Sequence, residues 1–147
     1  MIKIPAYLPQ SAVLLLVIFL SACGGRADNA QMLEIERPAP SAEYAGRNNP
    51  LARDAAAIEA GKQVYAANCA ACHGDEAMGD GPAANSLNPK PMPLATEMNV
   101  LQDDYIYWRI AEGGAYSPFT SAMPAWKSIL SEDEIWQVIA FMHTLAQ

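Results

Sequence analysis

The spacing of apolar residues in the last third of the chain predicts an amphipathic helix. Apolar residues recur there at intervals of three and four positions, and they are Ile135, Val138, Ile139, Met142 and Leu145. Trp136 and Phe141 widen this apolar stripe. Ser131, followed three residues later by Glu134, forms a capping-box signature, so we expect the helix to begin at this point.

Two further segments carry a helical pattern. One covers Asp103 to Glu112 and is stopped by Gly113-Gly114. The other begins after Asp54, which is a suitable N-cap. Five of its residues fall at helical spacing on one side of the expected helix, namely Ile58, Gly61, Val64, Tyr65 and Asn68. Glycine inside a helix costs about 1 kcal/mol relative to alanine. Gly61 therefore predicts the close approach of another helix.

The rest of this region consists of proline-rich loops, and no pair of strands is evident. The sequence thus predicts an all-α domain over residues 54–147, with three to four helices and long loops. So few helical residues give a thin core, and a domain of this kind needs an internal support. A large apolar cofactor would provide one.

The beginning of the chain has the pattern of an export signal. Lys3 precedes a continuous apolar run from Ala12 to Leu20, which is too short for the roughly 20 residues that span a membrane. The run ends in "LSAC", which resembles the bacterial lipobox. We therefore expect residues 1–22 to be a lipoprotein signal peptide and Cys23 to be lipidated, since two or three acyl chains make a firm anchor.

Residues 23–53 contain prolines, small residues and balanced charges, and they predict a flexible linker. The alternative is that this segment packs on a larger complex. From Asp54 onward the chain carries four basic and twelve acidic residues. No basic stripe is present, which argues against nucleic acid, and the acidic surface favours partners with basic patches.

The stretch "NCAACHGD" at residues 68–75 is the main candidate for chemistry. If Cys23 carries lipid, Cys69 and Cys72 remain, and export to an oxidising compartment allows a disulfide between them. A thioredoxin-like dithiol expects a strand before the motif, and here a helix precedes it. A zinc site needs four ligands, but only His73 and the distant His143 could join the two cysteines.

C-x-x-C-H is instead the attachment motif of c-type haem. Each thiol adds to one vinyl group of the porphyrin, and His73 can then ligate the iron. Haem attachment outside the cytoplasm agrees with the export signal. The sequence therefore predicts one covalently bound haem c.

Over residues 54–147 the chain resembles a class I c-type cytochrome. Gly61 and Tyr65 match the first helix of that family, Phe141 matches its last helix, and Gly74 extends the motif to CHG. The resemblance implies an all-α cytochrome c fold wrapped around one haem. It also implies a proline loop that supports His73, with Pro89 and Pro91 both possible.

The second axial iron ligand is sought among the methionines. Met92, Met98 and Met123 remain after the methionines of the signal, the linker, the last helix and the haem motif are set aside. "AMPAW" around Met123 resembles the Met-Pro ligand loop of the family, so we favour Met123. Met92 in "KPMPL" is the runner-up.

If His73 and a methionine fill both axial positions of the haem iron, no position is left for a substrate, which favours electron transfer over catalysis. We expect a membrane-tethered, monohaem electron carrier of a respiratory or photosynthetic chain, at the outer face of a bacterial cytoplasmic membrane, with an outer membrane as the other possibility. The alternatives are a fixed cytochrome subunit of a quinol-oxidising or oxidase complex, and a haem enzyme or sensor with an open iron site.

Overall fold

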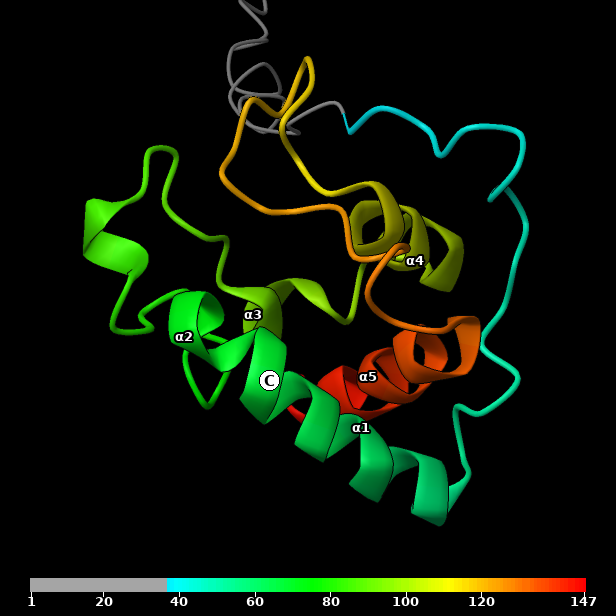
Figure 1. Ribbon diagram of the computed structural model, residues 1–147. Helices are drawn as coiled ribbons and strands as arrows, with labels where there is room; N and C mark the ends of the chain where they lie inside the picture. The colour runs from blue at the N-terminus through cyan, green and yellow to red at the C-terminus, as the bar shows by residue number, and fades with distance from the viewer. Residues whose placement is uncertain (1–36) are drawn as a thin grey trace, which may run out of the picture. The chain divides into compact units, whose positions relative to one another are not determined.

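The computed structural model describes residues 37–147, and these form one compact unit (Figure 1). The expected signal peptide and Cys23 lie outside the described residues. The described chain contains five α-helices and one short 3₁₀ helix but no strand. In chain order they are α1 (Ala55–Asn68), α2 (Ala70–His73), η1 (Ala84–Ser86), α3 (Leu94–Glu97), α4 (Asp103–Glu112) and α5 (Glu132–Thr144).

The three long helices are those that the apolar pattern predicts, and their ends have local causes. The side chain of Asp54 accepts a hydrogen bond from the backbone N–H of Ala57 at the start of α1. Ser131 and Glu134 form a complete capping box at the start of α5. Helix α4 ends at Gly113, whose φ of +71° is accessible to glycine at little cost.

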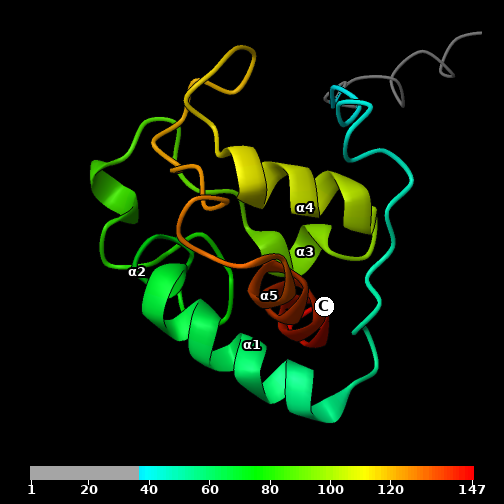
Figure 2. The ribbon, with the colours of Figure 1, turned by 45° about the vertical axis from the view of Figure 1, so that its right-hand side comes forward.

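Helices α1 and α5 cross in close contact, and Figures 1 and 2 both show them side by side. A Cβ placed on Gly61 would overlap the backbone carbonyl of Gln137, so only glycine lets the helices approach this closely. Tyr65 packs on Phe141 one turn later, with ring centroids 5.4 Å apart. The expected role of Gly61 as a helix contact is thus confirmed.

Helix α4 covers another side of α5 (Figure 2). The rings of Tyr107 and Trp136 join the two helices at a centroid distance of 4.3 Å. The core is built from the facing sides of α1, α4 and α5. Its most completely buried large side chains are Tyr65, Met98, Ile135, Val138 and Ile139.

Residues 37–53, which we call the N-terminal strap, differ from the expected flexible linker. The boundary expected at residue 53 is too late, because the compact unit begins at Arg37. Tyr44 is only 4% exposed and donates a hydrogen bond of 2.5 Å to Glu112. The guanidinium of Arg47 lies over the ring of Tyr107 and forms an ion pair with Glu132.

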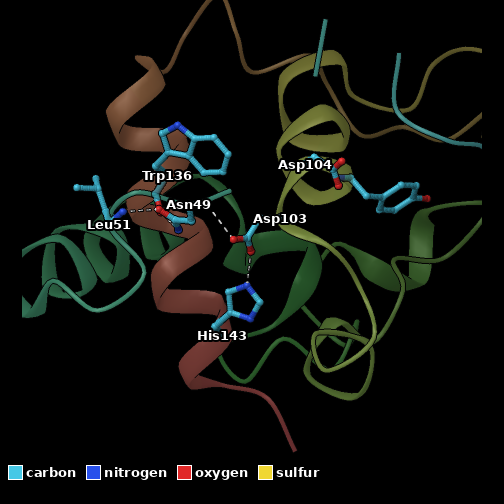
Figure 3. Close-up of polar contacts among 7 residues, drawn as sticks. Asn49, Leu51, Asp103, Asp104, Trp136 and His143 are labelled. Atoms are coloured by element: carbon cyan, nitrogen blue, oxygen red, sulfur yellow. Dashed lines mark hydrogen bonds and ion pairs between the residues drawn. The ribbon is translucent and has the colours of Figure 1, made fainter. Parts of the chain in front are cut away.

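Asn49 is the buried polar residue that fastens the strap (Figure 3). Its side-chain amide donates a hydrogen bond of 2.9 Å to the backbone carbonyl of Trp136, and its backbone N–H donates to Asp103 over 2.9 Å. The other carboxylate oxygen of Asp103 lies 2.8 Å from Nε2 of His143. The strap, the start of α4 and the end of α5 therefore meet at one polar junction.

Candidate functional site

Cys69, Cys72 and His73 lie on a single helical turn. Cys69 closes α1, and the backbone N–H groups of Cys72 and His73 donate to the carbonyl of Cys69 over 3.1 and 2.9 Å. Residues three and four positions apart share one face of a helix. The structure therefore brings the two thiols and the imidazole together on one side of this turn. Both thiols are free and half-buried, and they form no disulfide.

The imidazole of His73 is set among apolar surroundings. Nδ1 is fully buried and has no hydrogen-bond partner. Burial lowers the pKa of His73, and the nearby backbone of Met92 opposes this shift without completing a hydrogen bond to Nδ1. A neutral imidazole keeps a nitrogen lone pair, which is the form that binds a metal.

The cysteine thiol at the end of α1 is also perturbed. Burial, with a smaller contribution from the neighbouring Cys72, raises the pKa of Cys69 to about 12. Cys69 is therefore a neutral thiol near pH 7. It is a poor candidate for a reactive thiolate, since low-pKa cysteines need a polar or electropositive setting.

Gly74 directly follows the turn and fixes its end. Its φ of +81° favours glycine, and its carbonyl accepts a hydrogen bond of 2.7 Å from the hydroxyl of Tyr65. The N–H of Gly79 donates to the carbonyl of His73 over 2.8 Å. The chain after the motif thus folds back beneath His73. The expected support of His73 by Pro89 or Pro91 stays a prediction, and the backbone near the ring is that of Met92.

Met123 reaches the core from a separate loop, between α4 and α5. The N–H of Gly114 donates to the carbonyl of Met123 over 2.9 Å, and the N–H of Ser121 donates back to Gly114 over 2.7 Å. After Met123, the N–H of Trp126 donates to the carbonyl of Ile110 in α4 over 3.1 Å. These bonds tie both sides of the Met123 loop to the end of α4.

The other candidate methionines have different surroundings. Met98 is 2% exposed and belongs to the core. Met92 is 37% exposed, and its backbone lies on the His73 side of the site. Met123 is half-buried and packs against the core cluster. His143 is engaged by Asp103 at the polar junction of the strap.

The residues present fit a planar apolar group with two points of attachment. Several side chains pack against the core without being buried, and they include Cys69, Leu94, Tyr105, Phe119, Met123 and Trp126. Cys69 is itself one of these side chains, and Cys72 and His73 follow it on the same helical turn. Thiols, an imidazole and a thioether are the donors that hold haem c.

Arg109 borders the same region. Its guanidinium lies 3.3 Å from the ring centroid of Phe119 and 3.4 Å from the hydroxyl of Tyr116. None of the ion pairs formed within residues 37–147 includes Arg109. The expected pairing of Arg109 with a haem propionate therefore stays a prediction.

Sequence reasoning missed the strap and the hydrogen bond from Tyr65 to Gly74. Apolar residues do not recur at helical spacing in the strap. The one signal that it packs on the domain is the presence of two large side chains, Tyr44 and Arg47, among small residues. The Tyr65 bond joins residues nine positions apart across a turn whose course the spacing does not reveal. Within residues 37–147, no helix is long and apolar enough to cross a membrane.

Known proteins resemble this chain in sequence and in fold. A model of the family described as "Cytochrome C oxidase, cbb3-type, subunit III" matches residues 56–142. The cbb3-type cytochrome c oxidase subunit CcoP of Azospirillum brasilense is 33% identical over 104 residues, which are 71% of this chain and 34% of the relative. The chain spans about a third of the length of the curated relatives it matches.

Two solved structures are similar in fold. A chain of the reducing HAO-like protein complex of Kuenenia stuttgartiensis matches with a TM-score of 0.56 and 27% identity, over 78% of this chain and 53% of that one. Cytochrome cL of Methylophaga aminisulfidivorans matches with a TM-score of 0.52 and 24% identity, over 67% and 59% of the two chains. These likenesses confirm the all-α cytochrome c fold.

Three observations indicate the same family. They are the all-α fold, the CxxCH turn and the family match over most of the compact unit. The chain therefore belongs to the family described as cytochrome c oxidase, cbb3-type, subunit III, and it is a c-type cytochrome.

Proposed function

We propose that this protein is a membrane-tethered electron carrier with one covalently attached haem c. The observation that carries the proposal is the single helical turn that presents two free thiols and an unpartnered imidazole on one face. The sequence contains one CxxCH motif, which supports one haem. The similar oxidase subunit is longer, so the haem count of this chain has to be measured.

The residues then take distinct roles. Cys69 and Cys72 would hold the haem through thioether bonds. His73 and Met123 would be the protein ligands of its iron, with Met92 as the alternative to Met123. Haem c supplies a reversible one-electron change between ferric and ferrous iron, and a thioether ligand favours the ferrous form.

Two protein ligands leave no iron position for a substrate or oxygen. The chain therefore carries electrons and does not itself perform catalysis. Tyr65 and Gly74 hold the His73 turn in place, and the hydrogen bonds of Gly114 and Ser121 hold the Met123 loop. A rigid pair of ligands keeps the change in structure between the two redox states small.

The anchor follows from the start of the sequence. We propose that residues 1–22 are removed as a signal peptide and that Cys23 carries the lipid. The haem domain then lies on the periplasmic side of the cytoplasmic membrane. The domain begins at residue 37 instead of 54, because the strap packs with α4 and α5.

A second candidate is a fixed cytochrome subunit of a membrane oxidase complex. It is favoured by the similarity to a protein named as a cbb3-type oxidase subunit. Extraction in mild detergent followed by affinity purification separates the two. Stoichiometric recovery with a membrane complex supports the fixed subunit, and recovery of the cytochrome alone supports the mobile carrier.

The visible spectrum of the exported holoprotein tests the site. We expect a low-spin spectrum in both redox states and, in the ferric state, the far-red charge-transfer band between sulfur and iron. Met123→Ala should abolish this band, and Met92→Ala should leave it unchanged. Loss of the band in Met92→Ala would reverse the ligand assignment, and a high-spin ferric spectrum in the unaltered protein would indicate an open site.

A further inference from the structure

The loop after the haem motif exposes an unusual pair of methionines. Within residues 37–147 only four large hydrophobic side chains are substantially exposed, namely Met78, Met92, Val100 and Ile129. The backbone beside Met78 lies close to that of Met92, because a Cβ on Gly79 would overlap the backbone carbonyl of Pro91 and lie 3.3 Å from the backbone of Met92. Both are 37% exposed.

This pair lies beside the proposed haem site. Gly79, the neighbour of Met78, donates its N–H to the carbonyl of His73 over 2.8 Å. The backbone of Met92 is near the His73 ring. Two of the four exposed large hydrophobic side chains of residues 37–147 therefore belong to the loop next to the turn that carries both cysteines and the imidazole.

Three exposed carboxylates stand in the same loop, Asp75, Glu76 and Asp80. They line a shallow hollow together with Ala70 and Pro82. None of them takes part in the ion pairs formed within residues 37–147. Lys90, the cation of this loop, is hydrogen-bonded to the side chain of Asn85 over 3.0 Å.

We propose that Met78 and Met92, rimmed by Asp75, Glu76 and Asp80, form the surface on which a redox partner protein docks. The partner has an apolar centre surrounded by lysine or arginine. This inference rests on the proposed electron-carrier function and names the surface that serves it. Methionine side chains are flexible and polarisable, so they adapt to more than one apolar surface. Unpaired carboxylates steer a basic partner by long-range attraction.

The strap does not cover this surface. In Figures 1 and 2 the loop of residues 74–93 lies on the other side of the compact unit from the strap, which holds the start of the described chain. A partner bound at the methionine pair would therefore not compete with the strap.

A rate measurement with small oxidants of opposite charge tests the proposal. Tris(phenanthroline)cobalt(III) is a trication with an apolar aromatic rim, and tris(oxalato)cobalt(III) is a trianion. Each takes one electron from the reduced holoprotein, so that iron(II) becomes iron(III) and cobalt(III) becomes cobalt(II). The second-order rate constant is followed in a stopped-flow spectrophotometer through the haem spectrum.

The acidic rim is tested by Asp75→Asn with Glu76→Gln. Removal of two charges near the site should slow oxidation by the trication about tenfold at low ionic strength and should speed oxidation by the trianion. The control removes two exposed carboxylates elsewhere, by Glu43→Gln with Glu59→Gln. Equal slowing by both pairs would mean that only net charge matters, and it would overturn the docking surface.

The apolar centre is tested by Met78→Gln, with Ile129→Gln as the control for loss of an exposed apolar side chain. At high ionic strength, where charges are screened, Met78→Gln should slow oxidation by the trication severalfold and Ile129→Gln should not. Equal rates for the two variants would overturn the role of the methionine pair. A purified protein without covalent haem would instead refute the proposed function, so the two failures are distinguishable.

Discussion

Gly61 is the residue on which the contact between α1 and α5 depends. Gly61→Ala improves the intrinsic helix propensity of α1 by about 1 kcal/mol. The added Cβ nevertheless overlaps the carbonyl of Gln137, so the helices must separate. We expect a net loss of about 1–3 kcal/mol in the free energy of unfolding, as for other overpacked interfaces.

Thermal unfolding of the holoprotein, followed by circular dichroism, measures this loss. Ala66→Gly at an exposed position of α1 is the matched control and should cost about 1 kcal/mol through helix propensity alone. An increase in Tm for Gly61→Ala would show that the helices are not in the close contact described.

Glu112 gives a pH dependence with a definite sign. Hydrogen bonds from Lys127 (2.7 Å) and Tyr44 (2.5 Å) lower the pKa of its carboxyl. A lowered pKa in the folded state adds stability above the ordinary glutamate pKa, and this stability is lost as the pH falls through the folded value. We expect the free energy of unfolding to fall less steeply below pH ~4.5 in Glu112→Gln than in the unaltered protein.

Denaturant titrations of both proteins at several pH values check the slope. Glu59→Gln is the control, because Glu59 is exposed on α1 and contacts only Gln63 through its side chain. If the free energy of unfolding fell equally steeply at acid pH in Glu112→Gln and in the unaltered protein, the stabilising role of the Tyr44–Glu112–Lys127 contacts would be contradicted.

Single residues with a local function were predictable from the sequence. Asp54 and Ser131 cap their helices as expected, because a cap bonds to a backbone group only three residues away. The grouping of Cys69, Cys72 and His73 follows from their spacing on a helical turn. Tyr65 and Gly74 were not predictable as a pair, since their contact depends on how the turn at α2 bends.

The N-terminal strap is the element that the sequence did not reveal. Its contacts come from single side chains such as Asn49 and Tyr44, which have no period along the chain. The short helices α2, α3 and η1 were missed for a similar reason, because three or four residues are too few to show a repeat. The helices α1, α4 and α5 are long enough for apolar residues to recur at helical spacing, or for a stop signal such as Gly113-Gly114 to mark the end.

Asn49→Ala should detach the strap. The substitution leaves the buried carbonyl of Trp136 and the N–H of Leu51 without their partner, at a cost of about 1–3 kcal/mol. Hydrogen exchange measured by mass spectrometry should show faster exchange in residues 37–53, while the exchange of α1 changes little.

Asn48→Ala is the matched control. Asn48 is exposed, and its side chain donates a hydrogen bond only to the carbonyl of Gly46, over 3.2 Å. Similar exchange rates for the strap in the two variants would show that Asn49 does not hold it.

Across the whole molecule, the core is small and its border is only half-buried. We therefore expect the covalent cofactor to supply a large part of the stability. Cys69→Ser with Cys72→Ser removes both attachment points. A loss of several kcal/mol in a domain of this size lowers Tm by roughly 20 °C.

Calorimetry of the double-serine variant, compared with the holoprotein, checks this expectation. The covalent link is verified by mass spectrometry under denaturing conditions. A variant with an unchanged Tm would show that residues 37–147 fold stably on their own, and that the half-buried apolar border needs no cofactor.

The strap also limits how far the haem domain can travel. If Cys23 is held in the membrane, at most residues 23–36 separate the anchor from the strap, instead of residues 23–53. Fully extended, these 14 residues reach at most about 50 Å, whereas residues 23–53 would reach about 110 Å. The volume open to the domain scales with the cube of this reach, so the effective concentration of a partner near the anchor rises on the order of tenfold. Electron exchange would then be confined to immediate neighbours in the same membrane.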